Sequence, residues 1–453
     1  MIARSHTHHK IQFLIMSTFS IKILRVMFFL SAVSVRADNP VIKNRGVSDP
    51  HVRVFDGKVY LYAGHDESPS DKTWVMKRWQ VYSSTNLVDW IFESYIDPKN
   101  NFMGAGSRDC WAGDAAKRNG KYFFYFSDRD RSIGVMTAGS PTGPFTDPLG
   151  KPLVAPMHDP TVFVDDDGTP YLIYGHKLIA YRIARLNEDM ISLAEDPRDI
   201  AINGEAWQQA PEWMDKNYLF KHNGRYYLTW GRDYAVSDNV YGPYESIGAM
   251  GNGHHLNEFA HGSFFEWNGQ RYYIWCHYLK RLGSYYYKYR QSIMTYCHFT
   301  NDGRIVLDTD YLDHHAKTGV GQYNATWPEI EAEWFYGKTP GLQKQDCAEG
   351  GFEMTGWGSG EWLHYANVEF GKGATQFAVQ IANPGSGAEL CIHANIPDGP
   401  VIGTLYVPCT GDIYKHLSCP IEKISGKHDI YLSSDTARLR LNRFSFDTTQ
   451  ADQ

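Results

Sequence analysis

One pattern occurs five times along the chain and constrains the fold more than any other feature. An Asp-Gly or Asn-Gly pair precedes a run rich in Tyr and Phe each time, and the pairs begin at Asp56, Asn119, Asp167, Asn223 and Asn268. Such a pair predicts a type I′ hairpin turn, because both central residues of that turn need a positive φ. The spacing is close to the about 40 to 50 residues of a four-stranded propeller blade. The repeats therefore predict a five-bladed β-propeller over about residues 40–320, with a sandwich of recurrent hairpins as the alternative.

Composition narrows the class of protein. The 453 residues are 43% hydrophobic, carry a formal net charge of −7 and include 30 Tyr and 13 Trp. A mildly acidic chain without a long Lys/Arg run lacks the basic surface of a nucleic-acid binder and offers no polybasic membrane patch. We therefore expect a globular, all-β protein whose flat aromatic side chains suit contact with sugar rings.

The N-terminus has the features of an export signal. Residues 26–35 form an apolar run of about ten residues, which is shorter than the about 20 that span a bilayer. A small-x-small pattern follows it, so residues 1–37 are predicted to be a signal peptide, with residues 1–15 from an early start assignment. The mature protein would be secreted or periplasmic, without a membrane span; an N-terminal membrane anchor is the alternative. Export would permit disulfides, although seven cysteines cannot all pair.

Ionisable residues stand at the same distance before four of the predicted turns. Asp49, Asp159, Asp215 and His261 lie seven or eight residues upstream of their Asp-Gly or Asn-Gly pairs. The first strand of each propeller blade lines the central axis, so matched positions converge at one end of the channel. An unpaired buried carboxylate is costly, so this grouping favours a functional site. Each Asp alone could equally be an ordinary turn residue.

The same segments resemble glycoside hydrolase family 43, over most of residues 40–320. The matching pieces are Ser48-Asp-Pro-His, Trp111-Ala-Gly-Asp, His158-Asp-Pro-Thr and Ala260-His-Gly-Ser. The resemblance implies that Asp49 is the general base of an inverting hydrolase and that Asp159 orients the general acid and tunes its pKa. It also implies that His261 lies in the central channel and that Arg290 contacts the substrate. Trp111 would supply a stacking wall for the terminal sugar.

The general acid is where the sequence departs from that family. Family members usually carry a Glu five residues before the Phe of the fourth repeat, and the count back from Phe220 reaches Asp215. Glu212 resembles the motif in composition but is three residues out of register, which turns it to the other face of a strand. Asp215 is our first choice for the acid. Glu212 is the alternative if a bulge shifts the register, and Glu205 comes third.

After about residue 322 the texture changes, and residues 323–453 are predicted to be a second domain. Its opening Ile330-Glu-Ala-Glu and later segments resemble carbohydrate-binding module family 6, a β-sandwich of the jelly-roll type. The resemblance implies a structural calcium held by Glu331, Glu333 and Asn442, in keeping with the oxygen ligands of that ion. It also matches Trp357 to one of two aromatics that clasp a sugar, while Ile413 stands where the second is common.

These observations predict an exported glycosidase that acts on plant or algal polysaccharide or its oligosaccharides, in which residues 38–322 are the hydrolase domain. The family resemblance implies that the enzyme inverts. No organic cofactor is expected. Within the family we expect β-D-xylosidase activity first by base rate, with α-L-arabinofuranosidase or exo-galactanase as alternatives. A non-catalytic carbohydrate-binding propeller is the competing class. We also expect the two domains to separate in function, with small-substrate hydrolysis retained by residues 38–322.

Overall fold

The computed structural model describes residues 34–36, 39–212, 214, 216–251, 261–278, 289–315 and 317–448. Most of the predicted signal peptide, residues 1–37, lies outside these ranges. Its described part is β1 (Ser34–Arg36), which pairs antiparallel with β5. No helix in the described part of the chain is long and apolar enough to cross a bilayer.

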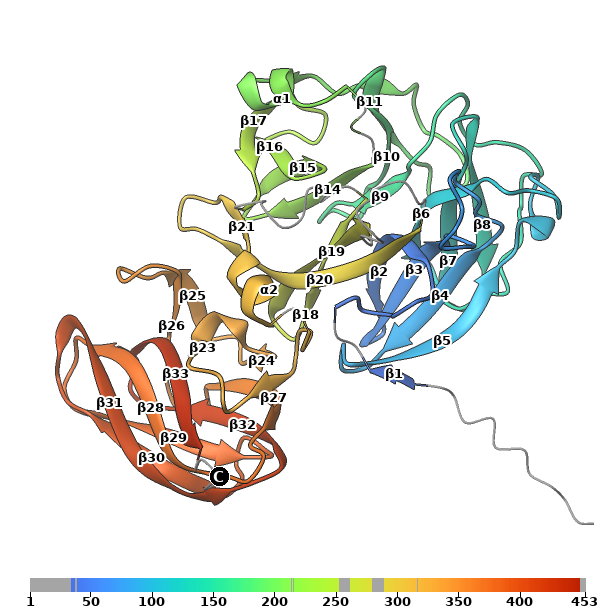
Figure 1. Cartoon of the computed structure of the whole chain (residues 1–453). Helices are drawn as coiled ribbons and strands as arrows, with labels where there is room; N and C mark the ends of the chain where they lie inside the picture. The colour runs from blue at the N-terminus through green and yellow to red at the C-terminus, as the bar shows by residue number, and fades with distance from the viewer. Residues whose placement is uncertain are drawn as a thin grey trace, which may run out of the picture. The chain divides into compact units, whose positions relative to one another are not determined.

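The described residues between 47 and 307 form the five predicted blades (Figure 1). Blade 1 consists of β2 (Val47–Phe55), β3 (Lys58–His65), β4 (Trp79–Ser84) and β5 (Asp89–Ile96). Blade 2 consists of β6 (Cys110–Arg118), β7 (Lys121–Asp128) and β8 (Ser132–Ala138). The 3-10 turn η1 (Pro98–Asn100) lies between the two blades in the sequence. Blade 3 consists of β9 (Thr161–Val164), β10 (Pro170–His176), β11 (Ala180–Arg185) and β12 (Arg198–Asp199).

Blade 4 consists of β13 (Ile202–Asn203), β14 (Asn217–His222), β15 (Arg225–Trp230), β16 (Asp233–Ser237) and β17 (Tyr244–Ala249), with the short helix α1 (Glu205–Gln209) after β13. Blade 5 consists of β18 (Ser263–Trp267), β19 (Gln270–Tyr278), β20 (Arg290–Phe299) and β21 (Ile305–Leu307), and α2 (Thr309–His315) follows. The inner strands contact one another in ring order, β2 with β6, then β9, β14, β18 and again β2. The predicted five-bladed propeller is therefore confirmed.

The hairpin turns agree with the prediction at four of the five repeats. Both turn residues have positive φ there, as at Asp56 (51°) and Gly57 (74°). The third repeat was predicted wrongly. Only Gly168 of its pair is left-handed, and the Gly168 N–H donates to the carbonyl of Asp165. The three consecutive aspartates before Gly168 lengthen this loop beyond two residues, so a type I′ turn is not needed.

Residues 39–44 join the ends of the ring. The Val41 N–H donates to the Ser292 carbonyl at 2.8 Å, and the Asn39 side chain both donates to and accepts from the backbone of Met294. Because Ser292 and Met294 lie on β20 of blade 5, the segment that enters blade 1 also covers the last blade. These contacts fix blades 1 and 5 next to each other.

The last third of the chain is a sandwich of two six-stranded sheets, in orange and red in Figure 1. One sheet contains β22 (Tyr323–Asn324), β24 (Gly337–Lys338), β27 (Trp362–Glu369), β29 (Ala388–Ala394), β30 (Val401–Val407) and β32 (Lys427–Ser433). The other contains β23 (Ile330–Glu331), β25 (Gln343–Asp346), β26 (Phe352–Thr355), β28 (Ala374–Asn383), β31 (Gly411–Ile424) and β33 (Arg440–Thr448), with the 3-10 turn η2 (Ala332–Trp334) after β23. The predicted sandwich is confirmed.

One hydrophobic cluster runs from the propeller into the sandwich. It includes Trp267, Tyr296 and Tyr311 of the propeller side together with Trp334 and Phe444 of the sandwich, all nearly or fully buried. From the sequence we expected the propeller and the sandwich to be functionally separate domains. The continuous core shows that the two domains fold against each other, with Trp334 in it and Trp327 packed against it near the junction.

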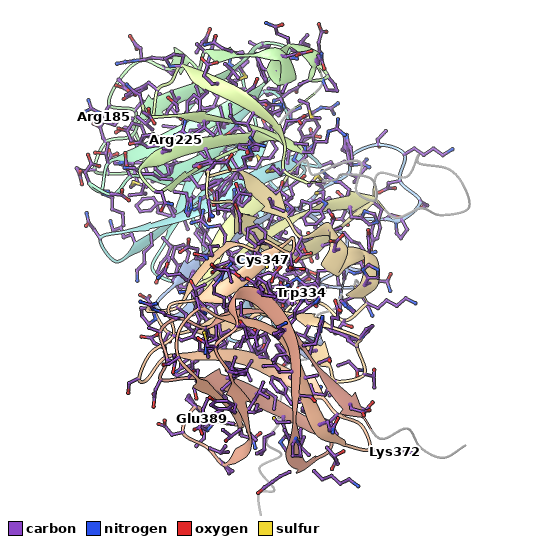
Figure 2. The ribbon with its side chains drawn as sticks, turned by 90° about the vertical axis from the view of Figure 1, so that its left-hand side faces the viewer. Arg185, Arg225, Trp334, Cys347, Lys372 and Glu389 are labelled. Atoms are coloured by element: carbon purple, nitrogen blue, oxygen red, sulfur yellow. The ribbon has the colours of Figure 1, made fainter. Side chains whose placement is uncertain are left out.

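Polar groups reinforce this junction. The Gln270 side-chain amide donates to the Glu333 carbonyl at 2.6 Å, and the Lys344 ammonium lies 2.6 Å from His298 Nδ1. The Trp334 indole N–H donates to the Asp308 carboxylate. Figure 2 shows Trp334 and Cys347 at one end of the sandwich and Glu389 and Lys372 toward the other. All seven cysteines are described, and none forms a disulfide.

Candidate active site

Asp49, Asp159 and His261 occupy equivalent places at the start of the inner strands of blades 1, 3 and 5. Each has a left-handed backbone, with φ of 48°, 60° and 54°. Such a conformation costs about 1–3 kcal/mol for a residue other than glycine and persists only where the surroundings impose it. His261 Nδ1 lies 2.9 Å from Asp49 Oδ1 and 3.9 Å from Asp159 Oδ2. The structure therefore brings together three of the four side chains that the sequence grouped by their matched distance from the hairpin turns.

Asp49 is buried and strongly ionised. Its Oδ1 accepts a hydrogen bond from Arg290 Nη1 in addition to the His261 contact, and its N–H donates to Cys276 Sγ at 2.9 Å. Burial alone would raise the pKa of Asp49, but Arg290 and His261 outweigh burial and hold the pKa well below its ordinary value. Asp49 is therefore a carboxylate at any pH near neutrality.

Arg290 is held by a second carboxylate that the sequence did not reveal. Asp66 accepts from the Arg290 backbone N–H at 2.6 Å and from Nε and Nη2 at 3.1 and 3.0 Å. The guanidinium also lies 4.2 Å from the ring centre of Trp74. Burial raises the pKa of Asp66, and Arg290 opposes the rise. Asp66 thus fixes the arginine that contacts Asp49.

Asp159 has a different set of partners. Its N–H donates to Ser127 Oγ at 2.8 Å, and its Oδ2 accepts from the Lys216 backbone N–H at 3.1 Å. Its Oδ1 is buried and has no hydrogen-bond partner among the described residues. An oxygen with spare accepting capacity beside the channel suits a residue that orients a neighbouring group.

A further charged pair lies along the inner strands. Arg53 Nε donates to Asp114 Oδ1 at 2.9 Å, and the N–H of Val162 donates to Asp114 Oδ2 at 2.8 Å. His51 Nε2 lies 3.6 Å from the same oxygen, and burial lowers the pKa of His51 well below its usual range. His51 is therefore neutral, and Arg53 balances the charge of Asp114.

The predicted general acid is not placed. Asp215, the first choice, lies outside the described residues, so its separation from Asp49 is not measured. Glu212, the alternative, is exposed in a turn before β14, and Glu205 is the first residue of α1. The choice between Asp215 and Glu212 stays a prediction.

Trp111 stands at the start of the inner strand of blade 2 and is half-buried. Its ring packs edge-on against His158, with centres 5.8 Å apart, and the Arg129 guanidinium lies 5.4 Å from its centre. His158 directly precedes Asp159 in the chain. The predicted stacking wall therefore lies beside the acids of the channel.

Trp357, the aromatic predicted to bind sugar in the sandwich, is not available for stacking. It is 2% exposed, belongs to the shared core and donates its indole N–H to the Met354 carbonyl at 3.1 Å. Ile413 is 64% exposed where the second aromatic is common, and Tyr414 beside it is buried. The expectation for Trp357 is corrected, because its side chain fills the core beneath the sheet.

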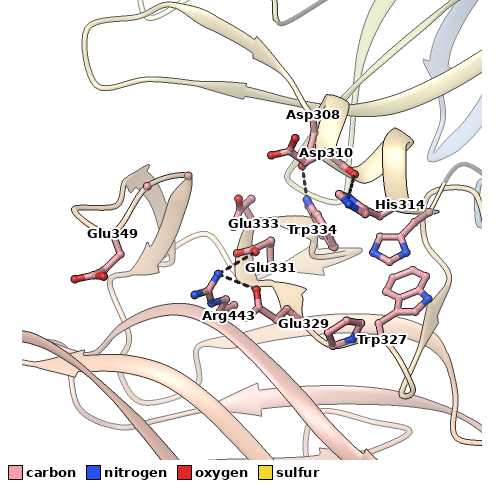
Figure 3. Close-up of a pocket in the computed structure, with 14 residues that line it drawn as sticks. Asp308, Asp310, His314, Trp327, Glu329, Glu331, Glu333, Trp334, Glu349 and Arg443 are labelled. Atoms are coloured by element: carbon pink, nitrogen blue, oxygen red, sulfur yellow. Dashed lines mark hydrogen bonds and ion pairs between the residues drawn. The ribbon is translucent and has the colours of Figure 1, made fainter. Parts of the chain in front are cut away.

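Two of the three residues predicted to hold calcium, Glu331 and Glu333, line a cavity of about 650 Å³ at the junction of the domains (Figure 3). The third, Asn442, is buried and donates its amide N–H to Gln380 at 2.9 Å. Glu333 Oε2 and Asn442 Oδ1 are buried without a hydrogen-bond partner in the described part of the chain. These hard oxygen atoms fit a calcium ion in donor chemistry.

The carboxylates of this cavity have few cations near them. Burial raises the pKa of Glu331 to about 7 and raises that of Glu333 well above its ordinary value, and only Arg443 opposes the rise at Glu331. Within the described ranges no three His, Cys, Asp or Glu side chains gather closely enough to hold a metal ion by themselves. A bound cation would need backbone or amide oxygens as further ligands.

A five-bladed propeller with buried carboxylates at one end of its channel and an aromatic side chain beside them is the arrangement that the sequence predicted for a glycoside hydrolase. The sequence model of glycosyl hydrolases family 43 matches residues 37–305, and the chain belongs to this family. The model of carbohydrate binding module family 6 matches residues 331–448.

Individual relatives extend the comparison to both domains. An arabinoxylan arabinofuranohydrolase from Bacillus subtilis is 26% identical over 92% of this chain and 92% of its own. A xylosidase/arabinosidase from Bacteroides ovatus is 29% identical but covers 45% of this chain and 78% of its own. The crystal structure of a family 43 arabinoxylan arabinofuranohydrolase from Bacillus subtilis in complex with cellotetraose has a TM-score of 0.52 at 25% identity, over 90% of this chain and 97% of that one.

Proposed function

We propose that this family 43 enzyme removes α-L-arabinofuranosyl side groups from arabinoxylan. The observation that carries the proposal is the extent of the similarity. The Bacillus arabinoxylan arabinofuranohydrolase aligns along both the propeller and the sandwich, whereas the Bacteroides xylosidase/arabinosidase aligns with less than half of the chain. The order of our expectations therefore changes, with arabinofuranosidase ahead of β-D-xylosidase.

In the proposed mechanism Asp49 is the general base. Its Oδ1 is engaged by Arg290 and His261, so Oδ2 takes the proton from the water that attacks the anomeric carbon. A Cβ at position 64 would collide with Met76 Cε and Ser48 Oγ and would lie 3.3 Å from Oδ2, so the close packing beside that oxygen requires Gly64. A base with a lowered pKa is a weaker proton acceptor but is fully ionised at working pH.

The leaving oxygen takes its proton from Asp215, or from Glu212 in the alternative. Asp159 orients that acid, and its negative charge raises the acid's pKa so that the proton is retained near neutrality. Inversion requires carboxyl groups about 6.5–9.5 Å apart, with the attacking water between them. Trp111 provides the face on which the terminal sugar stacks.

A panel of 4-nitrophenyl glycosides and wheat arabinoxylan tests the proposal. We expect turnover of the α-L-arabinofuranoside to exceed that of the β-D-xyloside, and arabinose to be the sugar released from the polymer while its main chain stays intact. Proton NMR should first detect the β anomer of arabinose if the reaction inverts. Release of xylose from chain ends would instead assign a β-xylosidase, which the similarity to the xylosidase/arabinosidase favours as second candidate. Absence of turnover on every substrate would leave a non-catalytic binding propeller.

Two further expectations belong to this proposal. Export through residues 1–37 would place the enzyme where polysaccharide is found, and N-terminal sequencing of the mature protein checks the cleavage. A calcium ion at Glu331, Glu333 and Asn442 would have a structural role, since these residues lie in the sandwich and not at the channel.

A further inference from the structure

Lys216 is buried among the carboxylates of the channel, where a lysine is unusual. It is 2% exposed and directly precedes β14, the inner strand of blade 4. Its ammonium donates to the Pro160 carbonyl at 2.7 Å and to Thr161 Oγ1 at 3.2 Å, while its backbone N–H donates to Asp159 Oδ2 at 3.1 Å. One residue thus ties blade 4 to the segment of blade 3 that carries Asp159.

The other buried carboxylates of the channel each have an arginine. Asp114 pairs with Arg53, and Arg290 serves both Asp49 and Asp66. In the described part of the chain, no arginine or lysine side chain forms an ion pair with Asp159, which is 1% exposed. A buried carboxylate without a nearby cation is strongly disfavoured.

The charge of Lys216 meets this need. Burial lowers the pKa of Lys216 to about 8, while the carboxylates of Asp114, Asp159 and Asp49 act against that fall and the Arg53 charge adds to it. The ammonium is therefore protonated at neutral pH. It is held by neutral oxygens of Pro160 and Thr161, which keep it in place without cancelling its charge.

We propose that Lys216 is a positioning residue whose ammonium is the counter-charge for Asp159 and keeps that carboxylate oriented in the channel. The inference rests on the proposed catalytic roles of Asp49 and Asp159. It adds a residue that neither the repeats nor the family motifs indicate.

Chemical rescue tests this role. Lys216→Ala removes the charge and leaves a space the size of a short alkylamine, so kcat/KM should fall by about 10²-fold, as small displacements of catalytic groups do. Addition of n-propylammonium should raise the kcat/KM of this variant at least about tenfold, and the increase should saturate with amine concentration. The uncharged 1-propanol, which has a similar size, should not raise it. Lys216→Met should lose as much activity and show no rescue, because its side chain fills the space.

Lys221→Ala is the matched control, since Lys221 lies on β14, the strand that Lys216 directly precedes, but pairs with Asp165. It should keep its activity and ignore the amine. Full turnover by a folded Lys216→Met variant would overturn the proposal, as would equal rescue by the amine and the alcohol, which would reduce Lys216 to a space-filling role. The Lys216 variants all retain Asp49, so their activities test the role of Lys216 alone. The proposed catalytic role of Asp49 would fail separately, if the Asp49→Asn variant were active.

Discussion

The channel of the propeller and the cavity at the domain junction both bury carboxylates, but they treat the charge in opposite ways. In the channel Asp49, Asp66 and Asp114 each pair with an arginine, and the pKa of Asp49 is held far below its usual value. At the junction Arg443 lies 3.8 Å from Glu331 and the charge of Lys344 acts on Glu333, but burial outweighs both cations and raises the two pKa values. The channel is therefore charged without any added ion, whereas we expect the junction to be stabilised by binding one.

The largest expected effect is the loss of hydrolysis in Asp49→Asn. An amide cannot take the proton of the attacking water, and general-base catalysis is worth about 10²- to 10⁴-fold. We expect kcat to fall by that factor, measured on the best substrate of the glycoside panel. Circular dichroism should show an intact fold, and Asp56→Asn, in the exposed first turn, is the control. Undiminished turnover in a folded Asp49→Asn protein would exclude Asp49 as the base.

The general acid should show a dependence on the leaving group. We expect Asp215→Asn to lose about 10²-fold or more on arabinoxylan oligosaccharides and far less on nitrophenyl glycosides, because an activated leaving group needs little protonation. Glu212→Gln should cause a smaller and uniform loss. Steady-state kinetics on both substrate types measures the difference, and the reverse pattern would assign the acid to Glu212.

Removal of the sandwich after residue 322 should destabilise the propeller. The cut exposes Trp267, Tyr296 and Tyr311, and each large apolar side chain contributes about 1.5–3 kcal/mol when buried. The melting temperature of the fragment should then be lower than that of the full chain by about 10 °C or more, or the fragment should not fold. This outcome opposes the functional separation expected from the sequence. A truncated protein that melts within about 3 °C of the full chain would show that the shared core contributes little.

The smallest effect concerns the junction acids and depends on pH. Because the folded-state pKa of Glu331 is raised to about 7, its contribution to stability is complete below about pH 4.5 and is lost as the pH rises through 7. Calcium binds the ionised form, so it should raise the melting temperature by a few degrees at pH 7.5 and by less at pH 5.5. Glu333→Gln should raise the calcium-free melting temperature and remove the calcium effect. A calcium effect that is equal at both pH values, or that persists in Glu333→Gln, would contradict the assignment.

In the propeller, the constant spacing between the hairpin turns and the residues before them was the most informative feature of the sequence. The hairpin pairs recur with the blades, so a count back from each turn located Asp49, Asp159 and His261 on strands that meet at one end of the channel. Asp66 and Lys216 were missed because neither occupies a repeated position. The one local signal for Lys216 was a lysine at the start of a strand that otherwise reads as buried and aromatic.

The sandwich shows where such reasoning ends. A tryptophan at position 357 fits a sugar-binding platform and a core position equally well, and only the packing of the two sheets decides between them. The linker composition around residues 317–324 is typical of a joint between independent domains. The continuous core depends instead on contacts between residues far apart in the sequence, such as Tyr296 and Tyr323, whose hydroxyls lie 3.3 Å apart.

The shared core also limits how genes for such proteins can recombine. Exchange of a binding module as a whole requires that each partner keep a closed surface at the cut. Here a transplanted module would arrive without the aromatic residues of α2 and β20 that complete its interior. A functional hybrid protein would need the residues of both domains that form the shared core. This propeller and its sandwich should therefore be inherited as a single unit.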